Sequence, residues 1–229
     1  MWQAVHHFVD LFYPRLCLGC SRNLYAHEQD ICWTCLYRLP RTRWHDMADN
    51  PLERLFWGRM EVKAVTSLLY FTKSGVTQQL LHKLKYKGMQ QVGIKLGNIL
   101  GQELKRSERF AGLDLVLPVP LHPKKEYLRG YNQSMLIASG LGEALEVPAN
   151  GQLLVRPHFT ETQTRKGRYE RWENVSEAFV CPRPDLLQQK KVLLVDDVLT
   201  TGATLEACGQ VLQAAGAQLW MATLACALR

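Results

Sequence analysis

Four cysteines in this sequence have a type and spacing that point to chemistry. They form two pairs, Cys17 with Cys20 and Cys32 with Cys35, and two residues separate the partners of each pair. This spacing lets both sulfurs of a pair reach one metal ion, and four thiolates close a tetrahedral Zn²⁺ site with no position for a substrate. The pattern predicts one structural zinc ion per chain. The alternatives are disulfides, which are rare in the cytosol, and a redox pair, which occurs singly.

A second chemical signal lies in residues 192–204. An apolar run is followed by two carboxylates and then by a short hydroxyl-rich segment: Asp196, Asp197, Thr200, Thr201, Gly202, Ala203 and Thr204. The run predicts a buried strand that ends at the carboxylates, then a loop and a helix. Backbone N–H groups of such a loop and the helix N-terminus bind phosphate, and glycine permits a close or left-handed backbone there. The carboxylates suit sugar hydroxyls or a divalent cation.

Three other interpretations of these paired acids fit less well. A P-loop ATPase needs a Gly-Lys-Ser or Gly-Lys-Thr segment, and the sequence contains neither. A phospho-acceptor receiver domain has its acidic pair near the start of the domain. Acids that only cap a helix leave the following threonines and glycine unexplained. A sugar-phosphate site is therefore the favoured interpretation.

The surrounding pattern predicts the elements that position this site. Predicted strands span residues 63–70, 113–119, 192–195 and 219–227, and predicted helices span residues 74–85, 89–104, 132–145 and 205–215. Strands that alternate with helices indicate an α/β fold with a mainly parallel sheet. In such sheets ligands bind beyond the carboxyl ends of the strands. Residues 156–176 are polar and predict a long exposed loop.

Length and composition limit the remaining possibilities. A chain of 229 residues fits one core domain and a small appendage, which we predict as residues 56–229 and residues 1–55, the latter with an N-terminal helix and the cysteines. It has no membrane span and no secretory signal, so a cytoplasmic location is expected.

The net charge is +7, and basic clusters such as Lys83, Lys85 and Lys87 suit phosphates or nucleic acid. An ordinary solvated surface is an equal alternative for each cluster.

Residues 192–204 resemble the phosphoribosyl-pyrophosphate (PRPP) motif of type I phosphoribosyltransferases. The longer pattern resembles the ComF family of competence-associated proteins, over nearly the whole chain. The resemblance rests on the four cysteines, on residues 84–86, 118–123 and 129–133, on Thr160, Gln163, Arg171 and Asn174, and on the PRPP-like motif.

The resemblance implies a fold and a role for individual residues. The fold is a type I phosphoribosyltransferase-like, mainly parallel sheet flanked by helices, with a small N-terminal zinc ribbon or knuckle. Asp196 and Asp197 would hold the ribose hydroxyls and Mg²⁺, and residues 200–204 the 5′-phosphate. The implied pyrophosphate loop and its neighbouring cations are Val119, Pro120, Leu121, Lys124 and Arg129. The implied flexible lid carries Gln163, Arg168, Arg171 and Asn174.

Two functions are compatible with these residues and with the resemblance. The first is a phosphoribosyltransferase-like protein that binds PRPP or a related ribose phosphate with Mg²⁺, in the context of DNA uptake and competence proteins. Its acceptor is not named by the sequence, and whether catalysis is retained stays open. The second is a non-catalytic nucleic-acid or nucleotide-binding module that docks partners through its zinc front, with Lys83, Lys85 and Lys87 on single-stranded DNA. Two carboxylates in the site would repel a phosphate backbone, which disfavours the second.

Overall fold

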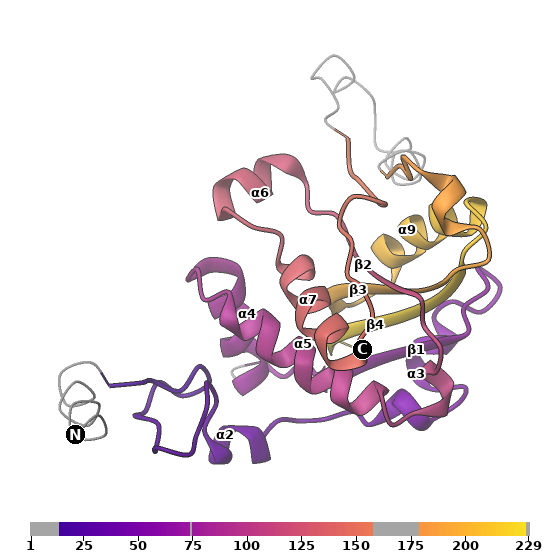
Figure 1. Cartoon of the computed structure of the whole chain (residues 1–229). Helices are drawn as coiled ribbons and strands as arrows, with labels where there is room; N and C mark the ends of the chain where they lie inside the picture. The colour runs from indigo at the N-terminus through magenta and orange to yellow at the C-terminus, as the bar shows by residue number, and fades with distance from the viewer. Residues whose placement is uncertain (1–13, 74, 158–178, 228–229) are drawn as a thin grey trace.

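A single parallel sheet forms the centre of the molecule (Figure 1). The computed structural model describes residues 14–73, 75–157 and 179–227. Four strands lie in the order β1-β4-β3-β2: β1 (Ala64–Tyr70), β2 (Leu115–Pro118), β3 (Lys191–Leu199) and β4 (Gln218–Cys226). Every neighbouring pair is parallel, which confirms the predicted fold class. The strands are apolar along most of their length because both faces of the sheet are covered.

Helices cover both faces of this sheet (Figure 1). One hydrophobic cluster joins the sheet to α4 (Val76–Tyr86), α5 (Gln91–Leu104) and α7 (Gln133–Leu145). A second cluster joins it to α9 (Ala203–Ala214). Helices α5 and α7 approach closely because Gly97 and Gly140 lack a Cβ, which would collide with the carbonyl oxygens of Ile137 and Ile94. Helices α4, α5, α7 and α9 confirm the four predicted helices.

The predicted end of the third strand is wrong. The sequence suggested a strand that stops at Val195, before the two carboxylates. In the structure β3 continues to Leu199, so Asp196 and Asp197 lie within the strand. The extension occurs because Val198 and Leu199 pair with Ala225 and Cys226 of β4, which prolongs the ladder.

A short helix that the sequence did not predict follows β2. Helix α6 (Pro123–Arg129) begins after His122, whose side chain accepts a hydrogen bond from the Lys124 N–H, and ends at Gly130, which has a φ of +79°. None of its residues is buried, so it carries no apolar periodicity that a sequence pattern could reveal. Figure 1 shows α6 standing away from the sheet, above α4.

Residues 40–54 cover the outer edge of β1. The Thr42 N–H donates to the Leu68 carbonyl at 3.1 Å, and the Tyr70 N–H donates to the Pro40 carbonyl at 2.8 Å. The 3₁₀ turn η1 (Trp44–Asp46) and helix α3 (Pro51–Arg54) follow. Smaller elements elsewhere are helix α2 (Trp33–Tyr37) and the 3₁₀ turns η2 (Glu108–Phe110) and η5 (Pro184–Leu187). The predicted division at residue 55 stays a prediction, although α3 already contacts the sheet.

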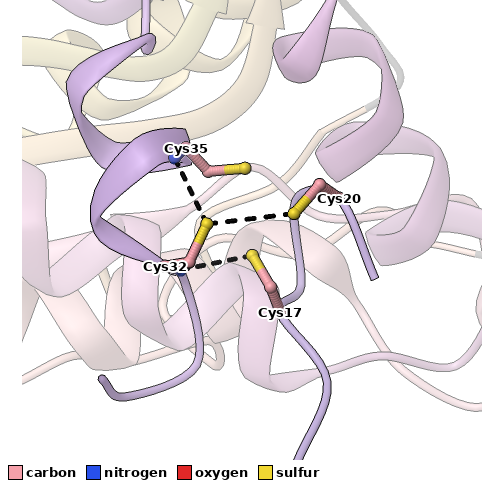
Figure 2. A group of neighbouring side chains, drawn as sticks. All are labelled: Cys17, Cys20, Cys32 and Cys35. Carbon is pink, nitrogen blue, oxygen red and sulfur yellow. Dashed lines mark hydrogen bonds between the residues drawn. The ribbon is translucent and has the colours of Figure 1, made fainter. Parts of the chain in front are cut away.

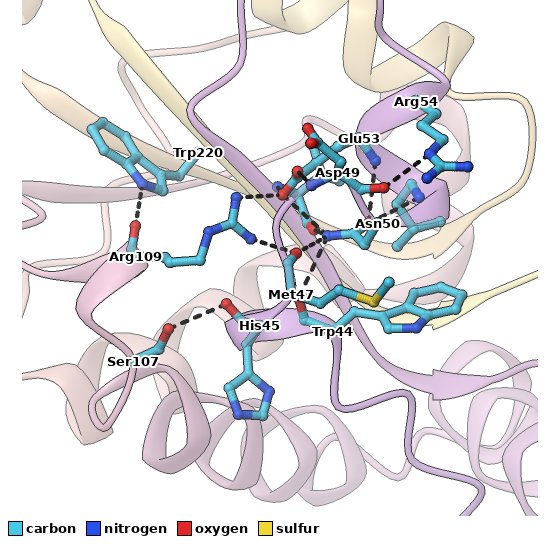
Figure 3. Close-up of polar contacts among 12 residues, drawn as sticks. Trp44, His45, Met47, Asp49, Asn50, Glu53, Arg54, Ser107, Arg109 and Trp220 are labelled. Atoms are coloured by element: carbon cyan, nitrogen blue, oxygen red, sulfur yellow. Dashed lines mark hydrogen bonds and ion pairs between the residues drawn. The ribbon is translucent and has the colours of Figure 1, made fainter.

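A buried polar network fixes α3 against β1 (Figure 3). Asn50 caps the helix by accepting from the Leu52 and Glu53 N–H groups, and its amide donates to the Val65 carbonyl at 2.9 Å. Arg109 pairs with Glu53 at 2.8 Å, and its own carbonyl accepts from the Trp220 indole N–H at 2.8 Å. Because the partners come from four separate segments, the network holds residues 44–54 in one position.

Some predictions fall outside the part of the chain that the structure describes. They are the lid residues Gln163, Arg168, Arg171 and Asn174 and most of the N-terminal helix. Among the described residues, no helix combines the length and the hydropathy that a membrane crossing needs.

Candidate functional site

A pocket of about 270 Å³ lies at the carboxyl ends of β2 and β3. It brings together seven of the predicted site residues: Val119, Pro120, Leu121, Arg129, Asp196, Asp197 and Thr204. It also includes Lys125, which the sequence placed near the pyrophosphate loop, and residues for which no role in a sugar-phosphate site was assigned: Lys85, Tyr86, His122, Gln133 and Arg156. The pocket occupies the edge of the sheet where parallel α/β proteins bind ligands.

Asp197 is the buried acid of the pair. Its residue exposure is 5%, and the ammonium of Lys85 lies 3.0 Å from its Oδ2. Lys85 was assigned with Lys83 and Lys87 to a possible nucleic-acid contact, and the structure brings only Lys85 of these three into the pocket. It lies there because it is in the last turn of α4. A buried carboxylate needs such a partner to remain charged.

Asp196 has a different set of partners. Its Oδ1 accepts from the Ser134 hydroxyl at 2.9 Å and from the Asp197 N–H at 2.8 Å. Burial and the neighbouring charge of Asp197 raise the pKa of Asp196 to about 7, against the opposing effect of these hydrogen bonds. The two acids therefore divide into one that is paired with a cation and one that titrates near neutral pH.

Asn132 connects the two sides of the pocket. Its side-chain oxygen accepts from the Ser134 N–H and so caps α7, as predicted from the sequence. Its amide donates to the Val119 carbonyl at 3.0 Å, which fixes the segment predicted to hold pyrophosphate. The Val119 N–H in turn donates to the Val195 carbonyl at 2.8 Å. The backbone at Val119 is therefore held from one side by α7 and from the other by β3.

The turn between β3 and α9 contains the left-handed glycine that the sequence predicted. Gly202 has a φ of +81°, in the left-handed region that favours glycine, and it precedes the first residue of α9. A Cβ at this position would also lie 3.0 Å from the Phe56 ring. Thr200, Thr201 and Ala203 are exposed, and of the five residues predicted for the 5′-phosphate only Thr204 lines the pocket.

Arg59 holds this turn and was not found from the sequence. Its guanidinium donates to the Thr201 carbonyl at 3.3 Å and to the Leu55 carbonyl at 2.9 Å, and it pairs with Glu206 in the first turn of α9. The guanidinium also lies over the Phe56 ring, 5.9 Å from the ring centroid. Arg59 and Glu206 are 147 residues apart, so no local pattern signals the pair.

The cations predicted near the pyrophosphate loop separate into two groups. Arg129 lines the pocket, where it hydrogen-bonds to Gln133, and Lys125 lies beside it. Lys124 instead lines a separate hollow on α6 with Tyr127 and Leu128. Helical spacing explains this difference, because adjacent helix residues point about 100° apart. Arg156 adds a further cation from the segment after α7, and no sequence signal marked it.

The four cysteines gather into one cluster (Figure 2). Their sulfurs all lie within 4.8 Å of one another, and the sulfurs of Cys20 and Cys32 are 3.8 Å apart. Four Zn–S bonds of about 2.3 Å in a tetrahedron place the sulfurs about 3.8 Å apart, so the cluster fits such an ion. Cys17, Cys32 and Cys35 are buried and Cys20 is exposed.

Backbone N–H groups stabilise charge on the sulfur of Cys17. The Gly19 and Cys32 N–H groups donate to the Cys17 sulfur at 3.3 and 3.2 Å. Burial raises the pKa of the Cys17 thiol, but the backbone donors outweigh it and lower the pKa to about 7. Glu28 holds the loop between the pairs by accepting from the Tyr25 and Trp33 N–H groups, both at 2.9 Å. The backbone thus favours the thiolate form of Cys17, whereas burial raises the pKa of the Cys35 thiol.

The cysteine module contacts the core through α4. Lys83 donates to the Leu18 carbonyl and to the Ser21 hydroxyl, both at 2.9 Å. Three of the cysteines belong to the same hydrophobic cluster as Leu81 and Leu84 of this helix. Lys87, the residue directly after α4, is exposed. Of the three lysines, one therefore anchors the module, one enters the pocket and one is exposed.

Comparison with known proteins shows which protein family this chain resembles. Residues 151–228 match the model of the phosphoribosyl transferase domain, and this match includes β3, the Gly202 turn and α9. Among solved structures, the chain is similar to the glutamine PRPP amidotransferase from B. subtilis, at 22% identity and a TM-score of 0.42, covering 57% of this chain and 25% of that one. The chain is a protein with a phosphoribosyl transferase domain built on a parallel sheet.

Its relatives define the family more closely. DNA utilization protein YhgH of Escherichia coli (strain K12) is 31% identical over 212 residues, which cover 90% of this chain and 88% of that protein. YhgH of Salmonella typhi is 33% identical over 147 residues, and the match spans 62% of this chain and only 64% of that relative's length. Competence protein F of Haemophilus influenzae is 28% identical over 148 residues, covering 62% and 65%. The chain belongs to the ComF family.

Proposed function

We propose that the pocket at the carboxyl ends of β2 and β3 binds PRPP or a related ribose phosphate together with Mg²⁺. The observation that carries this proposal is the placement of Asp196 and Asp197 beside Lys85, Arg129 and the start of α9 in one pocket. Carboxylates suit ribose hydroxyls and a hard cation, whereas the cations and the helix N-terminus suit phosphate. The match to the phosphoribosyl transferase domain supports the same ligand class.

Each part of the pocket has a proposed role. Asp196 and Asp197 accept hydrogen bonds from the ribose hydroxyls and are the residues that would hold Mg²⁺, which neutralises charge on a leaving pyrophosphate when it is bound. Residues 200–204 receive the 5′-phosphate. The backbone at Val119, Pro120 and Leu121 receives pyrophosphate, and Arg129 adds charge there. Lys85 must leave Asp197 or share it when a cation binds.

We further propose that the metal of the cysteine cluster is zinc and that its role is structural. Four thiolates leave no open coordination position for a substrate. The cluster contacts helix α4 at Lys83, whereas the same helix supplies Lys85 to the pocket, so the two sites are separate. In this proposal residues 1–55 form the zinc-bearing part and residues 56–229 the phosphoribosyltransferase-like part.

The names of the relatives suggest where such a protein acts. They include a DNA utilization protein and a competence protein, so we propose a cytoplasmic role connected with DNA uptake or use. A second candidate function, binding of nucleic acid without catalysis, is favoured by the net charge of +7 and by the exposed rings of Trp33 and Tyr37 on the cysteine module. The acidic pocket argues against nucleic acid at Asp196 itself.

One experiment separates the two functions. Purified protein is titrated by calorimetry with PRPP and Mg²⁺ and, at matched salt, with single-stranded DNA. Replacement of both acids, Asp196→Asn with Asp197→Asn, should weaken PRPP binding at least tenfold, because each lost charge-assisted hydrogen bond is worth about 1.5–3 kcal/mol. DNA affinity should stay the same or rise slightly, since negative charge is removed. Unchanged PRPP affinity in the double variant would refute the sugar-site assignment.

Gly202→Val offers an independent check on the phosphate turn. Valine is strained at a φ of +81°, and its Cβ would press on the Phe56 ring. PRPP binding should fall while DNA binding is unchanged. Gly112→Val is the matched control, because Gly112 has a similar φ of +70°, its Cβ would meet only the end of the Lys191 side chain, and it lies outside the pocket. Wild-type protein that binds DNA but no PRPP would instead favour the binding-module function.

A further inference from the structure

The ion pair between Lys85 and Asp197 has less support than the other buried ion pairs described here. It lies in the pocket at the carboxyl ends of β2 and β3, which we call the ribose-phosphate pocket, and the ammonium is 3.0 Å from the Asp197 Oδ2. The Asp197 side chain is only 8% exposed. Apart from this ion pair, its Oδ2 has no hydrogen-bond partner among the described residues. The charge on a buried oxygen therefore depends on one lysine.

Two other buried acids show how a structural ion pair is built in this protein. Glu28 pairs with Arg22 and also accepts from two backbone N–H groups. Glu53 pairs with Arg109 and likewise accepts from two backbone N–H groups. A buried ion pair offsets the cost of losing water only when such additional hydrogen bonds are present. The pair in the ribose-phosphate pocket lacks them at Oδ2, so it suits an exchangeable contact better than a structural one.

The position of Lys85 allows its ammonium to move. Lys85 is in the last turn of α4, and its side chain is 25% exposed, so part of it meets solvent. A lysine side chain is a flexible four-carbon chain that ends in a compact charge. Lys85 also borders a hollow of about 450 Å³ beside the ribose-phosphate pocket. The ammonium can therefore leave Asp197 without any repacking of the core.

The ammonium of Lys85 lies where a divalent cation on Asp197 would have to lie. A hard cation such as Mg²⁺ binds carboxylate oxygens at about 2.0–2.1 Å. An ion at that distance from the Asp197 Oδ2 would be next to the ammonium, and like charges so close repel each other strongly. Lys85 and a divalent cation therefore compete for the same carboxylate.

We propose that Lys85 is an internal counter-ion that takes the place of the divalent cation in the free protein and leaves Asp197 when a phosphorylated ligand binds. The proposal rests on the ribose-phosphate function proposed above and concerns the regulation of that site. In the free protein the ammonium neutralises Asp197 and keeps the affinity for divalent cations low. The negative charge of the ligand attracts the ammonium, which frees the carboxylate for the cation. Cation and ligand therefore bind cooperatively.

The test measures binding of Mn²⁺ alone, since Mn²⁺ prefers the same oxygen ligands as Mg²⁺ and its free ion is counted by paramagnetic resonance. In the full chain without ligand, Lys85→Gln should bind Mn²⁺ at least about fivefold more tightly than the wild type, because the competing charge is gone. Lys87→Gln removes the same charge at an exposed position outside the pocket and should change the Mn²⁺ affinity less than about twofold. Equal Mn²⁺ affinity of Lys85→Gln and the wild type would overturn the proposal.

Thermal unfolding gives a second readout, which also covers a loss of folding. Lys85→Gln leaves a buried carboxylate without a counter-charge, so its melting temperature should fall, and Mn²⁺ should restore it. The wild type should gain much less from the same concentration of Mn²⁺. If the variant stays unfolded at saturating Mn²⁺, the cation cannot take the place of the ammonium and the proposal fails. Lys85→Arg keeps the charge, so a gain in Mn²⁺ affinity in that variant would also contradict the proposal.

Three further outcomes locate the effect and separate it from the ribose-phosphate function. Adding Asp197→Asn to Lys85→Gln should abolish the gain in Mn²⁺ affinity, and a gain that persists would place the ion elsewhere and overturn the proposal. If Lys85→Gln gains Mn²⁺ affinity but the wild type does not bind ribose 5-phosphate, the exchange of lysine for cation stands and the ribose-phosphate function fails. If the wild type binds ribose 5-phosphate and Lys85→Gln gains no Mn²⁺ affinity, only the counter-ion role fails.

Discussion

Asp196 and Asp197 are adjacent on β3, yet their surroundings give them different chemistry. Asp197 is paired with Lys85, whereas Asp196 has hydroxyl and backbone N–H donors and no cation at hydrogen-bond distance among the described residues. The partners differ because Asp197 contacts the end of α4 through Lys85, whereas Asp196 contacts the start of α7 through Ser134. One residue pair thus presents an acid that is paired with a cation and an acid whose pKa is raised.

The raised pKa of Asp196 makes a prediction about stability. Its folded pKa of about 7 exceeds the ordinary value of 3.8, so its contribution to folding is most favourable below pH 4, declines as the pH rises to about 7, and is constant above that. Asp196→Asn should therefore raise the melting temperature progressively more between pH 5 and pH 8. Thermal unfolding followed by circular dichroism over that range checks this.

Asp114 is the matched control for this measurement. It is an exposed acid whose pKa is lowered by the Lys191 N–H and by Lys190. A lowered pKa contributes stability that is complete above pH 4, so the effect of Asp114→Asn should not vary between pH 5 and pH 8. A flat difference for Asp196→Asn as well would show that Asp196 does not titrate near neutral pH.

Lys85 yields a second prediction at the residue scale. Lys85→Gln should weaken ribose 5-phosphate binding about tenfold, because a cation that contacts the buried Asp197 and lines the phosphate-binding pocket is lost. Lys87→Gln removes the same charge just beyond the same helix, at an exposed position outside that pocket, and should change binding less than twofold. Calorimetry at fixed salt distinguishes them, and equal losses would indicate a general effect of net charge.

At the scale of elements, the turn before α9 is held from a distant part of the chain. Residues 55–59 follow α3, and Arg59 bridges from there to the Thr201 carbonyl and to Glu206. Glu206 places a negative charge in the first turn of the helix that is proposed to receive a phosphate. Arg59 both neutralises that charge and fixes the turn, so it is a positioning residue for the proposed ligand.

This arrangement predicts a rescue. Arg59→Ala should weaken ribose 5-phosphate binding about five- to tenfold, since it loses the hydrogen bond to the turn and leaves Glu206 unneutralised. Adding Glu206→Gln should restore part of the loss by removing the repulsion of phosphate. Arg54→Ala, on the neighbouring helix and outside the pocket, serves as the control. If the double variant binds no better than Arg59→Ala, electrostatic neutralisation is not the role of Arg59.

The elements differ in how far the sequence could predict them. Regular helices and strands were predicted where apolar residues repeat, as in α5 and β4. Helix α6 was missed because it buries nothing, and β3 was predicted too short because two acids interrupt its apolar run. The motif was enough to predict that Asp197 and Thr204 share a site. It did not indicate Arg59 or Arg156, because only tertiary folding brings these two residues near that site. Local patterns carry no signal for such long-range contacts.

At the scale of the whole molecule, the cysteine module and the pocket share helix α4. Lys83 binds the module, and Lys85 reaches Asp197 from the same helix. Lys95 of α5 adds an ion pair with Asp30 of the module at 3.7 Å. Three cysteines are buried in the cluster that contains Leu81 and Leu84. Loss of the module's shape therefore removes anchors from the helix that supplies a pocket residue.

We accordingly expect removal of the metal to affect both the cysteine module and the ribose-phosphate pocket. Cys32→Ser, or treatment with a strong zinc chelator, should unfold the module, because metal binding supplies much of the folding free energy of such sites. Amide hydrogen exchange should rise in residues 15–38 and in α4, and ribose 5-phosphate binding should weaken severalfold. Cys181→Ser, outside the cluster, is the control. Unchanged exchange after complete metal loss would show that the ion is not structural.

The strand order also bears on how the protein is made. The ribosome produces β1 first and β4 last of the four strands, yet these two lie side by side in the sheet. Residues 64–70, nearly all of them buried in the finished protein, must remain without their parallel neighbour while the next 150 or so residues are synthesised. The nascent chain therefore carries an apolar strand that lacks β4 along one edge until its final segment emerges. During that interval we expect β1 to be a binding site for a chaperone that shields apolar segments.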